Sequence, residues 1–532
     1  MSVSQPAAPD LGTPEPDEHP VAGRPATEPE RVRRVTVGDW WLPAAAAVLA
    51  VALFLLVKNS LTDDGYITLD YAKNLAVHGK WGMVDGSTAN SATSPLNVLL
   101  LGFLTLLTRV VGSPHPVIAL GVLNVVASAT IGWGWTRLMR AFNLPAAAAV
   151  VGLVLVLVNP FVLSATGLEV LLIPAVLMLL TVFAVEGRPA LFGVAVGLTV
   201  ITRLDLIVFV VLIALSAAPI RRKLLRVVAF AILVAGPWYL FSWFALGSFV
   251  PDTLVIKQAQ GGLFGQWDYF SGPMMYYTGR SLVVLVTFAP AIIGVAALLG
   301  WLATRFTARG REFPPVGPLV ALGLGGVAYY VIYSYLGVGP YHWYYVTPMV
   351  SAGMFVVALF GVWLAQSRKR QPRAKASAPA LAVGLVGVIA LSNVAVDIKQ
   401  GVPWPSPVIF GNWASAQEYA RVAKQIGQRL NGASVASPGE IGTLAYYCDC
   451  TILDEFSDRG QVTSLVQKQI DEAGTVMKLA YRVNYHWFDR GLRPRKTDYR
   501  LLYDRGPAKG PDSWQVYSAA KGIGHFTLVR QN

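Results

Sequence analysis

The sequence of 532 residues contains few cysteines, few histidines and few charged side chains. Two cysteines and six histidines are too few for a disulfide scaffold or a zinc ribbon. Charged residues make up 14% of the chain, whereas a soluble domain carries about 25%. This scarcity of charge excludes an ordinary soluble protein.

The sequence is instead rich in apolar residues. They form 54% of the sequence, and the mean hydropathy is +0.50. This composition indicates a polytopic α-helical membrane protein embedded in the lipid bilayer. The net charge of +13 belongs first to cytoplasmic loops in such a protein. We therefore expect no nucleic-acid partner.

The first 38 residues are rich in Pro, Glu and Ala and nearly free of large apolar residues. We predict that 1–38 form a disordered tail. The tail ends in Arg31-Val32-Arg33-Arg34, just before the first apolar run from Trp40 to Val57. Basic residues at that place predict a cytoplasmic N-terminus, so the run exits the membrane on the outer side. No small-residue cleavage site follows the run, which argues against a signal peptide.

Further apolar runs continue to residue 396 and predict a membrane domain over 39–396, with a first outer loop at 58–116. The runs lie near 117–136, 146–164, 168–186, 189–202, 205–219, 224–246, 281–302, 318–336, 347–366 and 379–396. Basic connectors such as Arg221-Arg222-Lys223 alternate with less basic ones. Placing every basic connector inside predicts about eleven spans, provided that the helix from Pro95 to Val111 lies along the outer face.

Composition changes after residue 396, and we predict an extracytoplasmic α/β domain over 397–532. An amphipathic helix is predicted for 413–430, because Tyr419, Val422 and Ile426 share one face. Strands are predicted for 434–437, 451–454 and 526–529. No internal repeat is visible in the chain.

Two adjacent carboxylates, Asp63 and Asp64, follow the first span. One acidic residue at a helix end is usually only solvated. A pair at a membrane boundary, followed by the polar and aromatic segment 66–74, favours a functional site.

Several short segments together resemble the GT-C fold glycosyltransferases, and most closely the actinobacterial arabinofuranosyltransferases of the AftB type. The segments follow one another in the family's order: Asp63-Asp64-Gly65-Tyr66, Ala92-Thr93-Ser94-Pro95-Leu96, Thr166-Gly167-Leu168-Glu169, Thr202-Arg203-Leu204-Asp205, and Gly247 to Thr253 with Lys257. Two positions depart from the family pattern, with Asn97 replacing a usual Trp and Asp70 a frequent Arg.

The resemblance implies transfer of a sugar from a polyprenyl-phosphate donor to a cell-envelope acceptor on the outer face of a bacterial cytoplasmic membrane. Arabinofuranose is the favoured sugar and mannose the second, with an arabinan, mannan or glycolipid acceptor. A transporter of lipid-linked sugars and a non-catalytic assembly protein are the rival hypotheses. A transporter is expected to contain paired halves, which this sequence lacks.

Glycosyl transfer passes through a cation-like sugar and needs a carboxylate or base at the reacting carbon. Asp63 or Asp64 is the candidate. Glu169 is the second carboxylate, either acting directly or pairing with a cation. Asp64 is also the candidate ligand for a divalent cation, Mg²⁺ or Ca²⁺.

The donor phosphate needs cations where water is scarce. Candidates are Arg203, which can hold phosphate through two N–H groups, Lys257, and the cluster that contains His342 and Tyr344. Each also has a simpler explanation. Arg203 could extend toward the interface, Lys257 could be an ordinary loop residue, and the aromatic cluster could form an interfacial belt.

Two features of the last domain stay open. Cys448 and Cys450 lack a second ligand pair for a metal, and in a strand their thiols would face opposite ways. The segments Tyr485-His486-Trp487-Phe488 and Arg493-Pro494-Arg495-Lys496 suit a carbohydrate or a solvated scaffold face.

Overall fold

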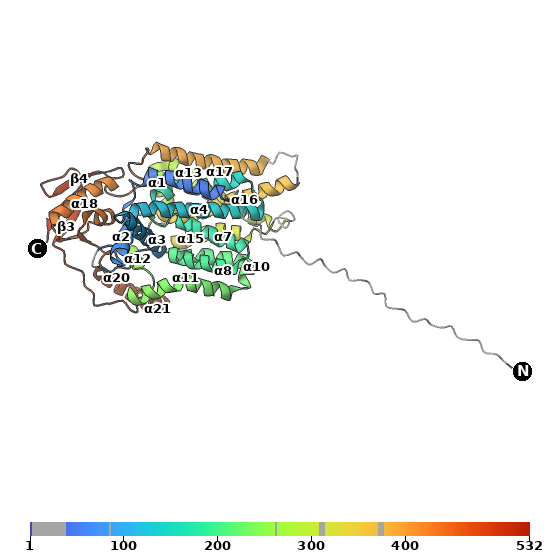
Figure 1. The fold of residues 1–532 in the computed structure, drawn as a ribbon, viewed down its shortest axis with the longest axis horizontal. Helices are drawn as coiled ribbons and strands as arrows, with labels where there is room; N and C mark the ends of the chain where they lie inside the picture. Colours follow the sequence, from blue (N-terminus) through green and yellow to red (C-terminus); the bar gives the residue numbers. More distant parts are fainter. Residues whose placement is uncertain (3–38, 85–86, 261–262, 308–313, 371–376, 532) are drawn as a thin grey trace. The chain divides into compact units, whose positions relative to one another are not determined.

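The computed structural model describes residues 1–2, 39–84, 87–260, 263–307, 314–370 and 377–531. Residues 3–38, for which we predicted disorder, lie outside the described part. The chain from Trp40 onward forms one unit, in which a bundle of helices is followed by a small sheet with its own helices (Figure 1).

Seven helical segments in the described part are long and apolar enough to cross a membrane. They are α4 (Pro116–Phe142), α5 (Ala146–Leu157) continued by α6 (Pro160–Ser164), α11 (Leu224–Ala245), α13 (Gly272–Thr304), α15 (Gly317–Tyr335), α16 (His342–Arg370) and α17 (Ser377–Lys399). Shorter apolar helices are α1 (Trp41–Val57), α3 (Pro95–Thr108), α7 (Leu172–Val185), α8 (Pro189–Thr202), and η3 (Leu204–Leu206) with α9 (Ile207–Ser216).

These segments match the predicted apolar runs and establish a multi-pass membrane protein. The count of about eleven spans, the position of α3 and the orientation of the chain stay predictions, because a 10–17-residue helix is at or below the length that a bilayer requires. The remaining helices before residue 400 are α2 (Asp63–His78), η2 (Arg109–Val111), α10 (Ala218–Arg221) and α12 (Thr253–Ala259).

Small residues allow the helices of the bundle to approach closely, as is usual in membranes. A Cβ atom on Gly193 of α8 would lie 2.5 Å from the carbonyl oxygen of Val227 on α11. A Cβ atom on Gly132 of α4 would lie 2.9 Å from the carbonyl oxygen of Leu42 on α1. Both pairs of helices therefore pack backbone against backbone.

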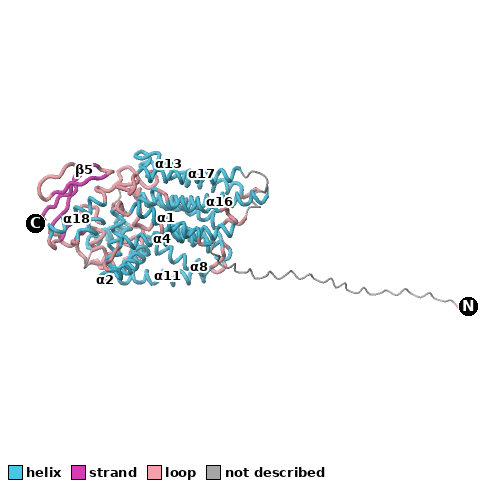
Figure 2. The backbone as a smooth tube through the Cα atoms, turned by 45° about the horizontal axis from the view of Figure 1, so that its top comes forward, coloured by secondary structure: helices cyan, strands magenta, loops and turns pink. Residues whose placement is uncertain are grey.

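The sheet that follows has the strand order β2-β1-β3-β5-β4. Its strands are β1 (Ser434–Ala436), β2 (Thr451–Leu453), β3 (Tyr499–Arg505), β4 (Ser513–Ser518) and β5 (Gly522–Arg530). β1 pairs in parallel with β2 and β3, whereas β5 is antiparallel to β3 and β4. Figure 2 shows the strands grouped at one end of the helices.

Four helices accompany the sheet: α18 (Ala416–Leu430), α19 (Gly442–Cys448), α20 (Arg459–Glu472) and α21 (Thr475–Asn484). Ser415 caps α18 by accepting a hydrogen bond from the N–H of Glu418 at 3.3 Å. The predicted helix and three predicted strands coincide with α18, β1, β2 and β5. The sequence reasoning missed β3, β4, α20 and α21, each of which exposes one side to the surroundings.

Helix α19 joins the α/β part to α2. The ring of Tyr66 on α2 lies 5.2 Å from the ring of Tyr446 and 5.7 Å from that of Tyr447. At the start of α19, a Cβ atom on Gly442 would lie 2.0 Å from the backbone oxygen of Asp63. Only glycine fits this contact.

We therefore predict that Gly442→Ala lowers the apparent melting temperature of the detergent-solubilised protein, because the added methyl group must displace backbone. A loss of about 1–3 kcal/mol is expected. Gly474→Ala is the matched control, since a Cβ atom at Gly474 meets nothing within 4 Å. Equal melting of the two variants would contradict the contact.

Candidate functional site

A pocket at the N-terminal end of α2 gathers most of the predicted site residues. Asp64, Glu169, Arg203, Lys257 and Tyr344 all line it. The other lining residues are Ile67, Thr68, Ser91, Ala92, Thr93, Ser94, Val98, Leu168, Thr253, Trp343 and Phe456. Its empty volume is about 560 Å³, part of which is open to solvent. Segments from seven regions of the chain therefore meet here.

The two adjacent acids of α2 have different surroundings. Asp63 and Asp64 occupy the first turn of the helix, where successive side chains point about 100° apart. Asp64 lines the pocket, and Asp63 does not. Within the described part of the chain, the carboxylate of Asp64 has no ion-pair partner, so it is available to a ligand.

Asp63 instead anchors α19. Its carboxylate accepts hydrogen bonds from the N–H of Gly442 at 3.0 Å and from the N–H of Thr443 at 2.7 Å. These are N–H groups of the first turn of α19, which have no partner within their own helix. Burial raises the pKa of Asp63 to about 6, and these backbone hydrogen bonds oppose the rise. The first acid of the pair thus has a structural contact where a catalytic one was predicted.

Other carboxyl groups lie close to Asp63. Glu440 accepts hydrogen bonds from the hydroxyl of Tyr419 and from the N–H of Trp413. Burial, and then the charge of Asp63, raise the pKa of Glu440 to about 8. Burial, and then the charge of Glu455, raise the pKa of Asp454 to about 8 as well. The junction between α2 and the α/β part is therefore a cluster of buried carboxyl groups whose pKa values are raised.

Arg203 is held by a buried network at the pocket wall. Its Nη1 donates to Oε1 of Glu169 at 2.6 Å, and its Nη2 donates to Oδ2 of Asp205 at 2.6 Å. Nη2 also donates to the hydroxyl of Tyr333 at 2.8 Å. The guanidinium lies 5.1 Å from the ring centre of Tyr344. Glu169 is thus a partner of Arg203, one of the two alternatives for this carboxylate.

Lys257 lines the same pocket without a carboxylate partner among the described residues. Its ammonium lies 4.1 Å from the ring centre of Tyr341, 5.3 Å from that of Phe456 and 5.9 Å from that of Trp343. Aromatic faces attract a cation without neutralising it. The charge of Lys257 therefore stays available for an anion.

His342 lies away from the pocket. It is buried, and its ring lies 6.4 Å from that of Phe161 and 5.0 Å from that of Trp343. It does not line the pocket, whereas its neighbours Trp343 and Tyr344 do. Of the predicted aromatic cluster, the structure brings Tyr344 to the site and leaves His342 in the core.

A divalent cation would find few ligands in this pocket. Among the described residues, no group of three or more His, Cys, Asp or Glu side chains is placed to hold a metal. Glu169 is already paired with Arg203. The residues do not fit an ion bound by protein alone, so a cation at Asp64 stays a prediction that requires ligands from the donor phosphate.

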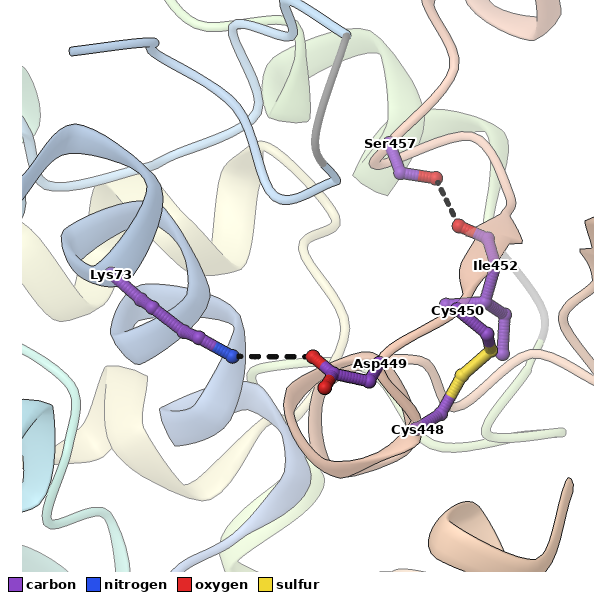
Figure 3. Close-up of a disulfide and its surroundings, with 6 residues drawn as sticks. All are labelled: Lys73, Cys448, Asp449, Cys450, Ile452 and Ser457. Atoms are coloured by element: carbon purple, nitrogen blue, oxygen red, sulfur yellow. Dashed lines mark hydrogen bonds and ion pairs between the residues drawn. A yellow bond between two sulfur atoms is a disulfide. The ribbon is translucent and has the colours of Figure 1, made fainter. Parts of the chain in front are cut away.

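Cys448 and Cys450 form a disulfide around Asp449 (Figure 3). Cys448 ends α19, and Asp449 has a left-handed backbone with φ of 53°. The pair thus encloses a turn, not the strand considered from the sequence. Asp449 also lies 3.9 Å from the ammonium of Lys73 on α2, an exposed contact that adds little stability.

No protein-family model and no curated protein matches the chain. Solved structures of other proteins do match the chain. ArnT from Cupriavidus metallidurans bound to undecaprenyl phosphate has a TM-score of 0.51 at 13% identity, over 92% of this chain and 98% of ArnT. Arabinofuranosyltransferase AftD from mycobacteria has a TM-score of 0.52 at 15% identity, over 94% of this chain. Both are GT-C glycosyltransferases.

The chain has the GT-C fold. It spans only 40% of AftD, so the remainder of that protein has no counterpart here. The GT-C fold confirms the predicted fold class, while the number of spans, the location of the α/β part and the AftB-type specificity stay predictions.

The sequence reasoning missed several residues of the candidate site. Asp205 and Tyr333 complete the network of Arg203. Asp205 carried a signal, since it stands two residues after Arg203 in a resembling motif. Tyr333 and Phe456 carried none, because they belong to an apolar helix and a distant loop.

The acid cluster predicts a dependence of stability on pH. A carboxyl whose folded pKa is raised contributes stability at low pH, and this contribution is lost as the pH rises through the folded pKa. The apparent melting temperature should therefore fall as the pH rises through about 6 for Asp63 and about 8 for Glu440 and Asp454.

Glu440→Gln should flatten the upper part of this decline, because the amide does not ionise. The measurement is thermal unfolding in detergent across the same pH values, and Glu472→Gln at the exposed end of α20 is the control. If Glu440→Gln leaves the dependence of melting temperature on pH unchanged, the raised pKa assigned to Glu440 is refuted.

Proposed function

We propose that this protein is a membrane glycosyltransferase that moves a sugar from a polyprenyl-phosphate donor to a glycan or lipid acceptor. The supporting observation is that one pocket contains both a carboxylate and an ammonium that lack partners of opposite charge among the described residues, Asp64 and Lys257. The GT-C fold, and the undecaprenyl phosphate bound to ArnT, agree with this proposal.

Lys257 binds the donor phosphate in this proposal. Its aromatic surroundings shield the half-buried side chain in part from water, which strengthens the attraction between the ammonium and a phosphate. Arg203 is less available, because Glu169 and Asp205 already occupy most of its N–H groups. Arg203 therefore acts mainly by fixing Glu169 and Tyr344 in the pocket wall.

Asp64 acts on the acceptor. Its carboxylate takes the proton from the acceptor hydroxyl, whose oxygen forms a bond to C1 of the sugar. The bond between C1 and the phosphate oxygen breaks at the same time. Its electron pair leaves with polyprenyl phosphate, where Lys257 stabilises the negative charge. Thr68, Ser91 and Ser94 add polar groups to the walls for sugar hydroxyls.

Arabinofuranose is the favoured sugar and mannose the second, with an arabinan, mannan or glycolipid acceptor. The support for arabinofuranose is the sequence resemblance together with the shared fold of AftD. The basic segment before α1 and the basic connectors support an outward-facing site, and the family resemblance supports a bacterial cytoplasmic membrane.

We predict that Asp64→Asn reduces sugar transfer about 10²–10⁴-fold, because the amide cannot accept the proton. The assay follows radiolabel from polyprenyl-phosphoryl sugars into product with purified protein in vesicles. Asp504→Asn, on the exposed side of β3, is the control and should retain activity. Full activity of Asp64→Asn would remove the proposed base.

We predict that Lys257→Gln weakens binding of polyprenyl phosphate about 10-fold or more, because the charge-assisted contact to phosphate is lost. Lipid binding is measured by tryptophan fluorescence or calorimetry. Lys521→Gln, in the exposed turn between β4 and β5, is the control. Unchanged lipid affinity in Lys257→Gln would place the phosphate elsewhere.

A further inference from the structure

Helix α21 of the α/β part presents an unusual exposed apolar stripe. Val476, Leu479, Val483 and Trp487 follow one another at spacings of three and four residues, and their exposed fractions are 80%, 65%, 53% and 51%. This spacing puts Val476, Leu479 and Val483 on one face of α21, and Trp487 extends the stripe from the turn that follows the helix. The opposite face is packed, since Tyr481 and Asn484 are buried, and Tyr485 and Phe488 just after the helix are buried as well. A soluble domain rarely leaves such a stripe uncovered.

The stripe continues an apolar surface of the membrane domain. The indole N–H of Trp243, near the end of α11, donates to the carbonyl of Val483 at 2.9 Å. The ring of Phe244 lies 5.6 Å from that of Trp487. Figure 1 shows α21 beside this end of α11.

Helix α11 is one of the seven candidate spans, and little of it is covered by other helices. Its exposed side chains include Leu233 at 69%, Leu240 at 56% and Phe244 at 57%. In a membrane protein such a surface is covered by lipid. Because the stripe of α21 adjoins this surface, lipid is the material next to it.

The charges of α21 also suit a membrane surface. The helix contains Lys478 and Arg482 and no acidic residue. Arg490 follows shortly after it and is exposed. Basic residues beside an apolar face attract anionic headgroups, and Trp side chains such as Trp243 and Trp487 are common at the same depth.

We propose that α21 lies in the plane of the bilayer interface, with its apolar stripe among the lipid chains and its basic residues at anionic headgroups. The α/β part thereby contacts lipid directly, in addition to its contacts with the membrane domain through α19 and α11. Protein partners would explain the exposed stripe but not its continuity with the lipid-covered face of α11.

The proposed contact reaches the candidate pocket through hydrogen bonds. The hydroxyl of Tyr481, on the buried face of α21, donates to Oε1 of Gln258 at 3.2 Å. Gln258 follows Lys257 in α12. The side chain of Asn484 accepts from the N–H of Val250 at 2.6 Å, in the segment that leads to α12. The position of α21 in the interface thus determines the depth in the membrane at which α12 places the ammonium of Lys257.

The test is a depth measurement on the full chain in vesicles of phosphatidylcholine and phosphatidylglycerol. A polarity-sensitive fluorophore is attached to Leu479→Cys and, as the control, to Lys521→Cys in the exposed turn between β4 and β5. Labelling is done without reductant, so that the disulfide between Cys448 and Cys450 stays intact and these two cysteines do not react with the fluorophore. Lipids brominated on their chains serve as the quencher.

We expect quenching at position 479 to exceed that at position 521 by at least about twofold, with a blue-shifted emission. Val483→Cys, one turn later, should behave like Leu479→Cys, so that a local artefact at one site is recognised. Equal quenching at 479 and 521 overturns the proposal. The fluorophore at position 479 could instead be protected in detergent, to a degree that grows with protein concentration. That result also overturns the proposal, because it indicates contact between copies of the chain.

Discussion

The hydrogen bonds between the carboxylate of Asp63 and the first turn of α19 are the constraint on which the rest of the site depends. They join a helix at the start of the chain to a helix of the C-terminal part. Because adjacent residues of α2 diverge, fixing Asp63 in this direction turns Asp64 toward the pocket. The close contact of Gly442 with the backbone of Asp63 leaves little freedom for another orientation.

The cations of the pocket are held in two physically different ways. Arg203 is buried with Glu169 and Asp205, so its charge is balanced within the protein. Removal of one partner would leave an uncompensated buried charge, which makes this network a rigid wall. Lys257 is surrounded by aromatic rings that leave its charge unbalanced. The Arg203 network fixes the shape of the pocket wall, and the ammonium of Lys257 gives the pocket its affinity for anions.

Much of the fold followed from the sequence, because apolar runs and the amphipathic pattern of α18 depend on local periodicity. The grouping of Asp64, Glu169, Arg203 and Lys257 also followed, through ordered motifs that resemble a known family. The features that the sequence did not reveal concern the directions of side chains and of the backbone. Sequence alone does not tell which way Asp63 and His342 point, or that Asp449 turns the chain so that two cysteines meet. Strands β3 and β4 lacked the apolar alternation that reveals a half-buried strand.

The contact between α2 and α19 joins residues 380 positions apart in the chain. During translation α2 leaves the ribosome long before α19 exists, so the amides that orient the acid pair arrive much later than the acids themselves. A nascent chain can thus insert its first helices in the bilayer while its pocket is still unformed. Synthesis of α19 becomes the step that assembles the chemistry.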